Sequence, residues 1–183
     1  MTYPATSILT TDIDSDFTFD PDVFFQAIKQ WTTITHLEIY GIDGLPSDDL
    51  SEFSSYMKSL SQLSTLVLFG IGAATSIAHS LFMSRYDQTA EPLLPRLSSF
   101  LLATADTEMS PNHDDLSNFL EARQHHHLPR LQNLSINSQY IQYLRESNRM
   151  DILWESSENI FVISDPEIGK FNSIQEEKLL LHE

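Results

Sequence analysis

The sequence predicts an α/β fold of stacked strand-helix units, with parallel strands on the concave side of a short solenoid and helices on its convex side. Internal repeats are the main observation behind this prediction. Three pairs of segments match: Leu94-Pro95-Arg96-Leu97 with Leu128-Pro129-Arg130-Leu131, Ile39-Tyr40-Gly41-Ile42 with Leu68-Phe69-Gly70-Ile71, and Asp48-Asp49-Leu50-Ser51 with Asp114-Asp115-Leu116-Ser117. A unit of about 30 residues cannot bury its own apolar face, so neighbouring units must cover one another.

A six-residue pattern, apolar-x-x-apolar-x-apolar, predicts the strands. Its second and third apolar positions alternate as in a strand with one buried face, and its first lies where the chain bends into the strand. The four copies are Ile34/Leu37/Ile39, Leu63/Leu66/Leu68, Leu97/Phe100/Leu102 and Leu131/Leu134/Ile136. They begin 29, 34 and 34 residues apart, which gives one strand to each unit.

Residues with helical spacing lie between these strands. Asp20-Pro21 is an N-cap followed by proline at the first helical position, and it predicts a helix in an incomplete first unit. Asp48 and Asp49 favour a second helix start through capping and the helix dipole. The inward faces predicted for these two helices and for a third are Phe24/Ile28/Trp31, Leu50/Phe53/Met57/Leu60 and Leu116/Phe119/Leu120.

The last part of the chain closes the predicted stack. Ile141 and Leu144 begin a helix that extends to Trp154, and Ile160-Phe161-Val162-Ile163 predict a last strand that caps the open end of the sheet. Residues 20–164 then form the repeat domain, between a partly ordered N-terminal segment at 1–19 and a partly ordered tail at 165–183.

Composition restricts the functions open to this domain. A chain of 183 residues predicts one continuous core, and a net charge of −16 disfavours nucleic acid and anionic membranes as partners. The absence of Cys excludes disulfides and thiolate metal sites and is typical of the cytoplasm or nucleus.

Neither a secretory signal nor a membrane span is expected. Residues 1–16 contain no Lys or Arg, which a signal peptide needs at its start. The stretch 59–84 carries no charged residue and is long enough to cross a bilayer, but ten of its residues are Ser, Thr, Gln or His. A buried strand followed by a buried helix explains it better.

These strands, repeat lengths, Leu-Pro-Arg-Leu entries and Asp-Asp-Leu helix starts resemble irregular leucine-rich repeats of the long, helix-containing type. More narrowly, they resemble the C-terminal half of F-box proteins common in fungi, over roughly residues 20–164. The resemblance implies a leucine-rich-repeat solenoid and a non-catalytic protein-protein interaction module. In that family such a module is the substrate-recognition part of an F-box-type ubiquitin-ligase adaptor.

Two features depart from the family. Its members carry Asn or Cys three residues after the last strand Leu, where this chain has Ile42, Ile71, Ala105 and Gln139. The F-box itself, which docks the Skp adaptor of cullin ubiquitin ligases, is not recognisable before Phe24. Docking of this chain to the Skp adaptor is therefore not expected.

The candidate binding site is the sheet face that the inward apolar residues leave free. Alternation along the strands points the intervening side chains toward that face. An apolar patch rimmed by polar residues is typical of protein-binding surfaces. The predicted partner-binding residues are Glu38, Tyr40, Val67, Phe69 and Leu101. The alternative is that the N-terminal segment or the tail covers this face, or that these residues only pack together.

The His125-His126-His127 run, with His113, Asp114 and Asp115 upstream, contains metal-compatible ligands. Adjacent side chains diverge and no His-x-x-x-His spacing is present, so a solvated loop is expected and no metal or cofactor is assigned. The sequence also has no Gly-x-Ser-x-Gly elbow and no phosphate-binding loop, so no catalytic residue is predicted. The alternatives are a small hydrolase or metal-dependent enzyme that uses the His-rich loop, and a degenerate repeat fragment without function.

Overall fold

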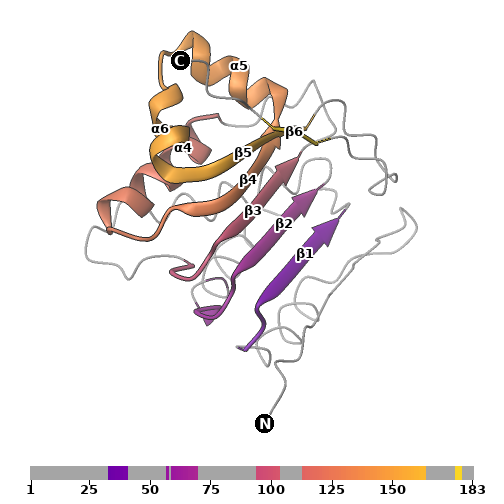
Figure 1. The fold of residues 1–183 in the computed structure, drawn as a ribbon. Helices are drawn as coiled ribbons and strands as arrows, with labels where there is room; N and C mark the ends of the chain where they lie inside the picture. The colour runs from indigo at the N-terminus through magenta and orange to yellow at the C-terminus, as the bar shows by residue number, and fades with distance from the viewer. Residues whose placement is uncertain are drawn as a thin grey trace, which may run out of the picture.

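The computed structural model describes residues 33–40, 57, 59–69, 94–103, 113–163 and 176–178. They form an α/β structure around a single six-stranded sheet whose strand order is the order of the sequence (Figure 1). The strands are β1 (His36–Tyr40), β2 (Thr65–Phe69), β3 (Ser99–Ala103), β4 (Leu131–Asn137), β5 (Ser157–Ile163) and β6 (Glu176–Lys178). The first five are parallel, and β6 pairs antiparallel with β5.

The strand register confirms the alignment of the repeats. In each of the first four strands the middle apolar position of the six-residue pattern lies beside its counterpart in the next strand. Ile160 of β5 continues this row, which is Leu37, Leu66, Phe100, Leu134 and Ile160. All five side chains are at most 5% exposed, so the row forms a continuous apolar core across the sheet.

A ladder of backbone bonds joins the units where the chain enters each strand. The carbonyl of Thr35 accepts the amides of Ser64 and Thr65, at 2.9 and 3.0 Å. The carbonyl of Ser64 accepts the amides of Ser98 and Ser99 in the same way. The carbonyl of Ser98 then accepts two amides at the start of β4. One acceptor per unit thus fixes two donors of the next unit and holds the parallel strands in register.

Two serine hydroxyls strengthen this ladder. Ser64 Oγ donates to the Thr35 carbonyl at 2.9 Å, and Ser98 Oγ donates to the Ser64 carbonyl at 3.0 Å. Both serines stand directly after the first apolar residue of the pattern, Leu63 and Leu97. The repeat is therefore visible in the hydrogen bonds as well as in the apolar residues.

Three helices of the described part of the chain pack on the first face of the sheet, which is the face of the apolar row. They are α4 (His113–His125), α5 (Ser138–Glu146) and α6 (Met150–Ser156). Their buried side chains belong to the same core cluster as the apolar row, and they include Leu116, Phe119, Leu120, Ile141, Leu144 and Leu153. The predicted third helix and its inward face are confirmed. The helix predicted at 20–31 lies outside the described residues, as does most of the one predicted at 48–60, but Met57 and Leu60 are buried in the core.

The helix predicted from Ile141 to Trp154 is in fact two helices. Its first part, α5, ends in a Schellman motif, in which Arg149 N–H bonds to the Leu144 carbonyl and Asn148 N–H to the Arg145 carbonyl. Asn148 has φ 56°, the left-handed conformation that this motif requires. Asn adopts it more readily than most residues, so the helix stops here without a glycine or proline.

The last parallel strand begins earlier than predicted and forms a fifth unit. β5 starts at Ser157, which pairs in register with Leu131, so Ser157 stands at the first position of the apolar pattern. Ile160 and Val162 fill the other two positions. Ser157 is 2% exposed, and its hydroxyl has no hydrogen-bond partner among the residues that the structure describes. β6, within the predicted tail, then pairs with residues 161–163 of β5.

Candidate functional site

The second face of the sheet carries the predicted partner-binding residues. The strand register places Glu38 beside Val67 and Val67 beside Leu101, which confirms that these three residues share one face. Tyr40 and Phe69 pair in register at the ends of β1 and β2. Their side chains lie outside the part of the chain that the structure describes.

The half of this face near the strand ends is buried. Val67 is 7% exposed, and Ala103 and Ile163 are fully buried. Leu101 is partly buried and packs against these three residues. Ser135 and Asn137 of β4 are also buried, at 6% and 4% exposure. The apolar middle of the face is thus packed, and Val67 presents almost no surface to a partner in this conformation.

The half near the strand starts carries a polar row that remains accessible. His36, Thr65, Ser99, Asn133 and Asn159 lie side by side in five consecutive strands. All five side chains are half-buried. The row and the buried cluster together show that exposure on this face falls from the strand starts toward the strand ends.

Glu38 adjoins the β1 end of the polar row. Its carboxylate Oε1 lies 2.6 Å from Nε2 of His36, which is the nearest residue on the same face of the strand. The Glu38 side chain is 18% exposed and the His36 side chain 28%, so solvent screens the pair only in part. Among the predicted site residues with described side chains, Glu38 is the one that combines charge with access to solvent.

Arg123 is a buried cation that sequence reasoning did not single out. It lies in the last turn of α4 and is 4% exposed. Its guanidinium donates to three backbone carbonyls, those of Leu94, Leu97 and Pro129, each at 3.0 Å. Burial lowers the pKa of Arg123 to about 10, so the group stays charged at neutral pH.

The three carbonyls explain why a charge is buried there. Leu94 and Leu97 belong to one Leu-Pro-Arg-Leu motif and Pro129 to the other, so Arg123 ties two repeat units together. Leu94 has φ 50°, an unusual conformation for leucine. The signal in the sequence was an arginine on the apolar side of a helix, four residues after Phe119 and three after Leu120.

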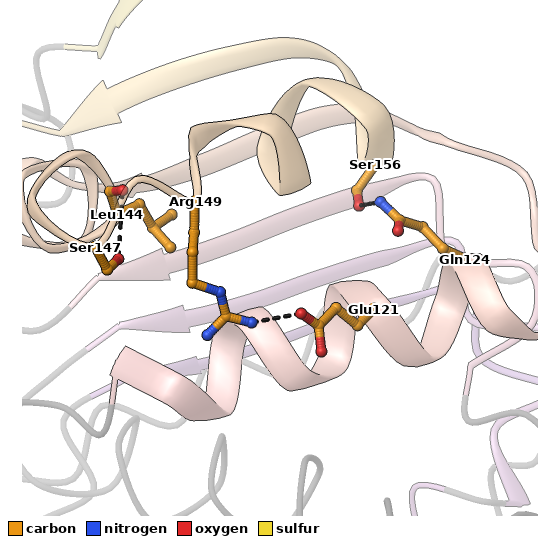
Figure 2. A network of polar contacts seen from close by, with 6 residues as sticks. All are labelled: Glu121, Gln124, Leu144, Ser147, Arg149 and Ser156. Carbon is orange, nitrogen blue, oxygen red and sulfur yellow. Dashed lines mark hydrogen bonds and ion pairs between the residues drawn. The ribbon is translucent and has the colours of Figure 1, made fainter.

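Polar contacts on the helix side join α4 to α6 and to the loop before it (Figure 2). Arg149 forms an ion pair with Glu121, and Gln124 Nε2 donates to Ser156 Oγ at 2.8 Å. Figure 2 shows these side chains pointing toward one another across the gap between the helices, where they hold the helix layer together. We assign this network a structural role, because the groups drawn satisfy one another.

The histidine run closes α4. His127 N–H bonds to the Gln124 carbonyl and Leu128 N–H to the Arg123 carbonyl, which is the same Schellman motif that ends α5. His127 has φ 54° at the left-handed position of this motif. His125 is the last helical residue, and the rings of His125 and His126 meet edge to face with centroids 5.6 Å apart. The three histidines are thus explained by their place at the end of α4.

The described ranges hold neither a metal site nor a membrane-spanning helix. They contain no group of three or more His, Asp or Glu side chains placed to hold a metal ion. His113, Asp114 and Asp115 begin α4, but their side chains are not among those described. In the same ranges, none of the helices combines the length and apolar character needed to cross a membrane.

Comparison with known proteins returned no match: no family model fits the chain, and no curated protein and no solved structure is significantly similar to it. The repeat geometry and the two faces of the sheet are therefore the basis for assigning a function.

Proposed function

We propose that this chain is a non-catalytic leucine-rich-repeat solenoid that binds another protein through the second face of its sheet. The observation that supports the proposal is the recurrence of one geometry in successive units. The same sequence positions lie side by side in consecutive strands, and the same carbonyl-to-amide bonds join them. Units that stack in this way commonly present a continuous surface to a binding partner.

The Leu-Pro-Arg-Leu entries resemble those in the C-terminal half of fungal F-box proteins, and this resemblance makes the proposal narrower. In the narrower proposal, the chain is the substrate-recognition part of an F-box-type ubiquitin-ligase adaptor. The proposed binding residues are Glu38, Tyr40, Phe69 and Leu101 and their neighbours on the same face, and Val67, which is 7% exposed, supports Leu101 from within the sheet face. Since no F-box is recognisable before Phe24, the chain by itself should not co-purify with a Skp adaptor.

Site-specific photo-cross-linking tests the binding face. A photoreactive phenylalanine analogue replaces Leu101 on the second face or, as a control, Trp154, which is 41% exposed on the helix side. Each protein is irradiated in extract, and the cross-linked partner is identified, purified and titrated against the unmodified chain. We expect one partner to cross-link at position 101 and not at 154.

The titrations then separate the two faces quantitatively. Leu101→Ala should weaken binding of that partner by tenfold or more, and Trp154→Ala should leave it within twofold, with both variants folded by circular dichroism. Cross-linking only from position 154, or equal affinity for wild type and Leu101→Ala, would contradict a partner site on the sheet.

A further inference from the structure

The polar row divides the second face into parts with different accessibility, and this bears on what can bind there. The apolar residues near the strand ends are buried, with Ala103 and Ile163 fully so. The row formed by His36, Thr65, Ser99, Asn133 and Asn159 is half-buried in all five strands, so each residue keeps part of its surface accessible. A partner that approaches this face therefore meets hydrogen-bonding groups first.

The chemistry of the row is uniform. Its hydroxyl, amide and imidazole groups can each donate and accept hydrogen bonds, and four of the five carry no charge at any pH. Asn159 Nδ2 donates a hydrogen bond to the Gln132 carbonyl at 2.9 Å. Thr65 Oγ1 and Ser99 Oγ, in contrast, have no side-chain partner within the described ranges. Groups that can both donate and accept hydrogen bonds match the amides and carbonyls of a peptide main chain.

The dimensions of the row fit a short extended segment. Neighbouring strands lie about 4.8 Å apart, so five strands span about 19 Å. An extended peptide rises about 3.3 Å per residue, so about six residues would cross the row from β1 to β5. Each hydrogen-bonding side chain could then reach a main-chain group of the segment.

Charge selects a basic segment. The chain has 26 acidic and 10 basic side chains, so its field attracts cations that come within about a Debye length of its surface. On the second face itself, Glu38 places a carboxylate at the β1 end of the row.

The two arginines nearest the strand starts do not reverse this preference. Arg96 is bound to Gln62 Oε1, and Arg130 is bound to the carbonyls of Trp154 and Ser157. Both guanidinium groups keep their charge but are held at neutral acceptors of the chain. Acidic side chains still outnumber basic ones over the whole chain.

We infer that the polar row is a docking site for an extended, basic peptide segment of a partner protein, held through its main chain. This rests on the proposed function and states which part of the sheet face makes the contact and what it recognises. The contact does not require the buried apolar cluster to open.

A peptide selection tests this inference on the full chain. A displayed library of random ten-residue linear peptides is panned against the protein, and the enriched sequence is synthesised and titrated by fluorescence anisotropy. We expect the enriched peptides to be rich in Lys and Arg. Their association rate should fall at least fivefold between about 50 and 500 mM salt, because electrostatic attraction is screened.

A matched pair of variants locates the site. The triple variant Thr65→Val, Ser99→Ala, Asn133→Ala removes three groups of the row, and Ser138→Ala, Gln142→Ala, Ser147→Ala removes three exposed polar groups of α5 and its C-cap. We expect the first to weaken peptide binding at least tenfold and the second to leave it within twofold. If the triple variant unfolds, the single variant Ser99→Ala replaces it. We expect this variant to bind the peptide about threefold more weakly, because it loses one hydrogen bond.

The outcomes separate this inference from the proposed function. Enrichment of acidic or apolar peptides, absence of enrichment, or equal binding by the row variant and the α5 variant overturns the basic-peptide site. A further outcome is that the partner that cross-links at position 101 binds the row variant normally but binds Leu101→Ala more weakly. In that case the proposed function stands, and the polar row is not the surface that contacts this partner. Loss of affinity with the row variant supports both.

Discussion

Ser157 is the residue at which the fifth unit departs from the repeat. The first position of the apolar pattern holds Ile34, Leu63, Leu97 and Leu131 in the other units, and here it holds a buried hydroxyl without a partner in the described part of the chain. An unsatisfied buried hydroxyl costs about 1–3 kcal/mol. A smaller apolar side chain at this position avoids that cost.

Ser157→Ala should therefore raise the free energy of unfolding by about 1 kcal/mol. Ser98→Ala is the matched control, because the Ser98 hydroxyl donates to the Ser64 carbonyl and its loss should lower stability by about 1 kcal/mol. Urea unfolding followed by circular dichroism measures both. Destabilisation by Ser157→Ala equal to that of Ser98→Ala would show that the Ser157 hydroxyl is satisfied in solution.

Arg123 is the residue that joins the two Leu-Pro-Arg-Leu motifs. Arg123→Met keeps the apolar stem and removes the donors to three carbonyls, so we expect a loss of about 3 kcal/mol in the free energy of unfolding. Arg123→Lys should recover only part of it, because an ammonium group cannot reproduce the planar geometry. Arg145→Met, at an exposed site of α5, should change stability by less than about 0.5 kcal/mol. A loss below 1 kcal/mol for Arg123→Met would refute this role.

At the scale of elements, helix ends decide how each unit turns back toward the sheet. Both α4 and α5 close with a Schellman motif, and both use a residue other than glycine in the left-handed conformation, His127 and Asn148. Such a conformation costs an L-residue about 1–2 kcal/mol relative to the right-handed one. Glycine carries no such cost.

His127→Gly should therefore raise the free energy of unfolding by up to about 1 kcal/mol. The same substitution two residues earlier, His125→Gly, should lower it by about 0.5–1 kcal/mol because His125 is still helical. Thermal unfolding of the two variants and wild type gives the comparison. Destabilisation of the chain by His127→Gly would mean that the histidine ring does more than occupy the end of the helix.

Strands were easier to predict than helix ends. The apolar pattern at Leu37, Leu66, Phe100 and Leu134 repeats in register, and a sheet of parallel strands follows from it. The break after α5 gave no such signal, since Ser147-Asn148-Arg149 contains neither glycine nor proline. The start of β5 was missed because a serine occupies its first pattern position.

The whole sheet shows what periodicity can and cannot give for the candidate site. Alternation placed Glu38, Val67 and Leu101 on one face, and the register confirms it. Alternation says nothing about how deeply that face is covered at the strand ends, so the burial of Val67 could not be predicted. Arg123 was missed because an inward arginine looks like an exception in an apolar stripe until its three carbonyl partners are known.

The central claim about the whole molecule is that the repeats stack as neighbouring strands in one register. Cysteine cross-linking tests it directly, because the chain contains no Cys of its own. Thr65 pairs with Ser99, and Ser99 with Asn133, so cysteines at either pair would have Cα atoms about 4.8 Å apart, within the range of a disulfide. Cysteines at Thr65 and Asn133 would be about 10 Å apart, which is too far.

The measurement is disulfide formation under mild oxidation, read by mass mapping of the three double variants. The account predicts intramolecular cross-links in Thr65→Cys/Ser99→Cys and in Ser99→Cys/Asn133→Cys, and none in Thr65→Cys/Asn133→Cys. A cross-link in the last variant, together with none in the first two, would place the second and fourth units side by side and contradict the stacking order.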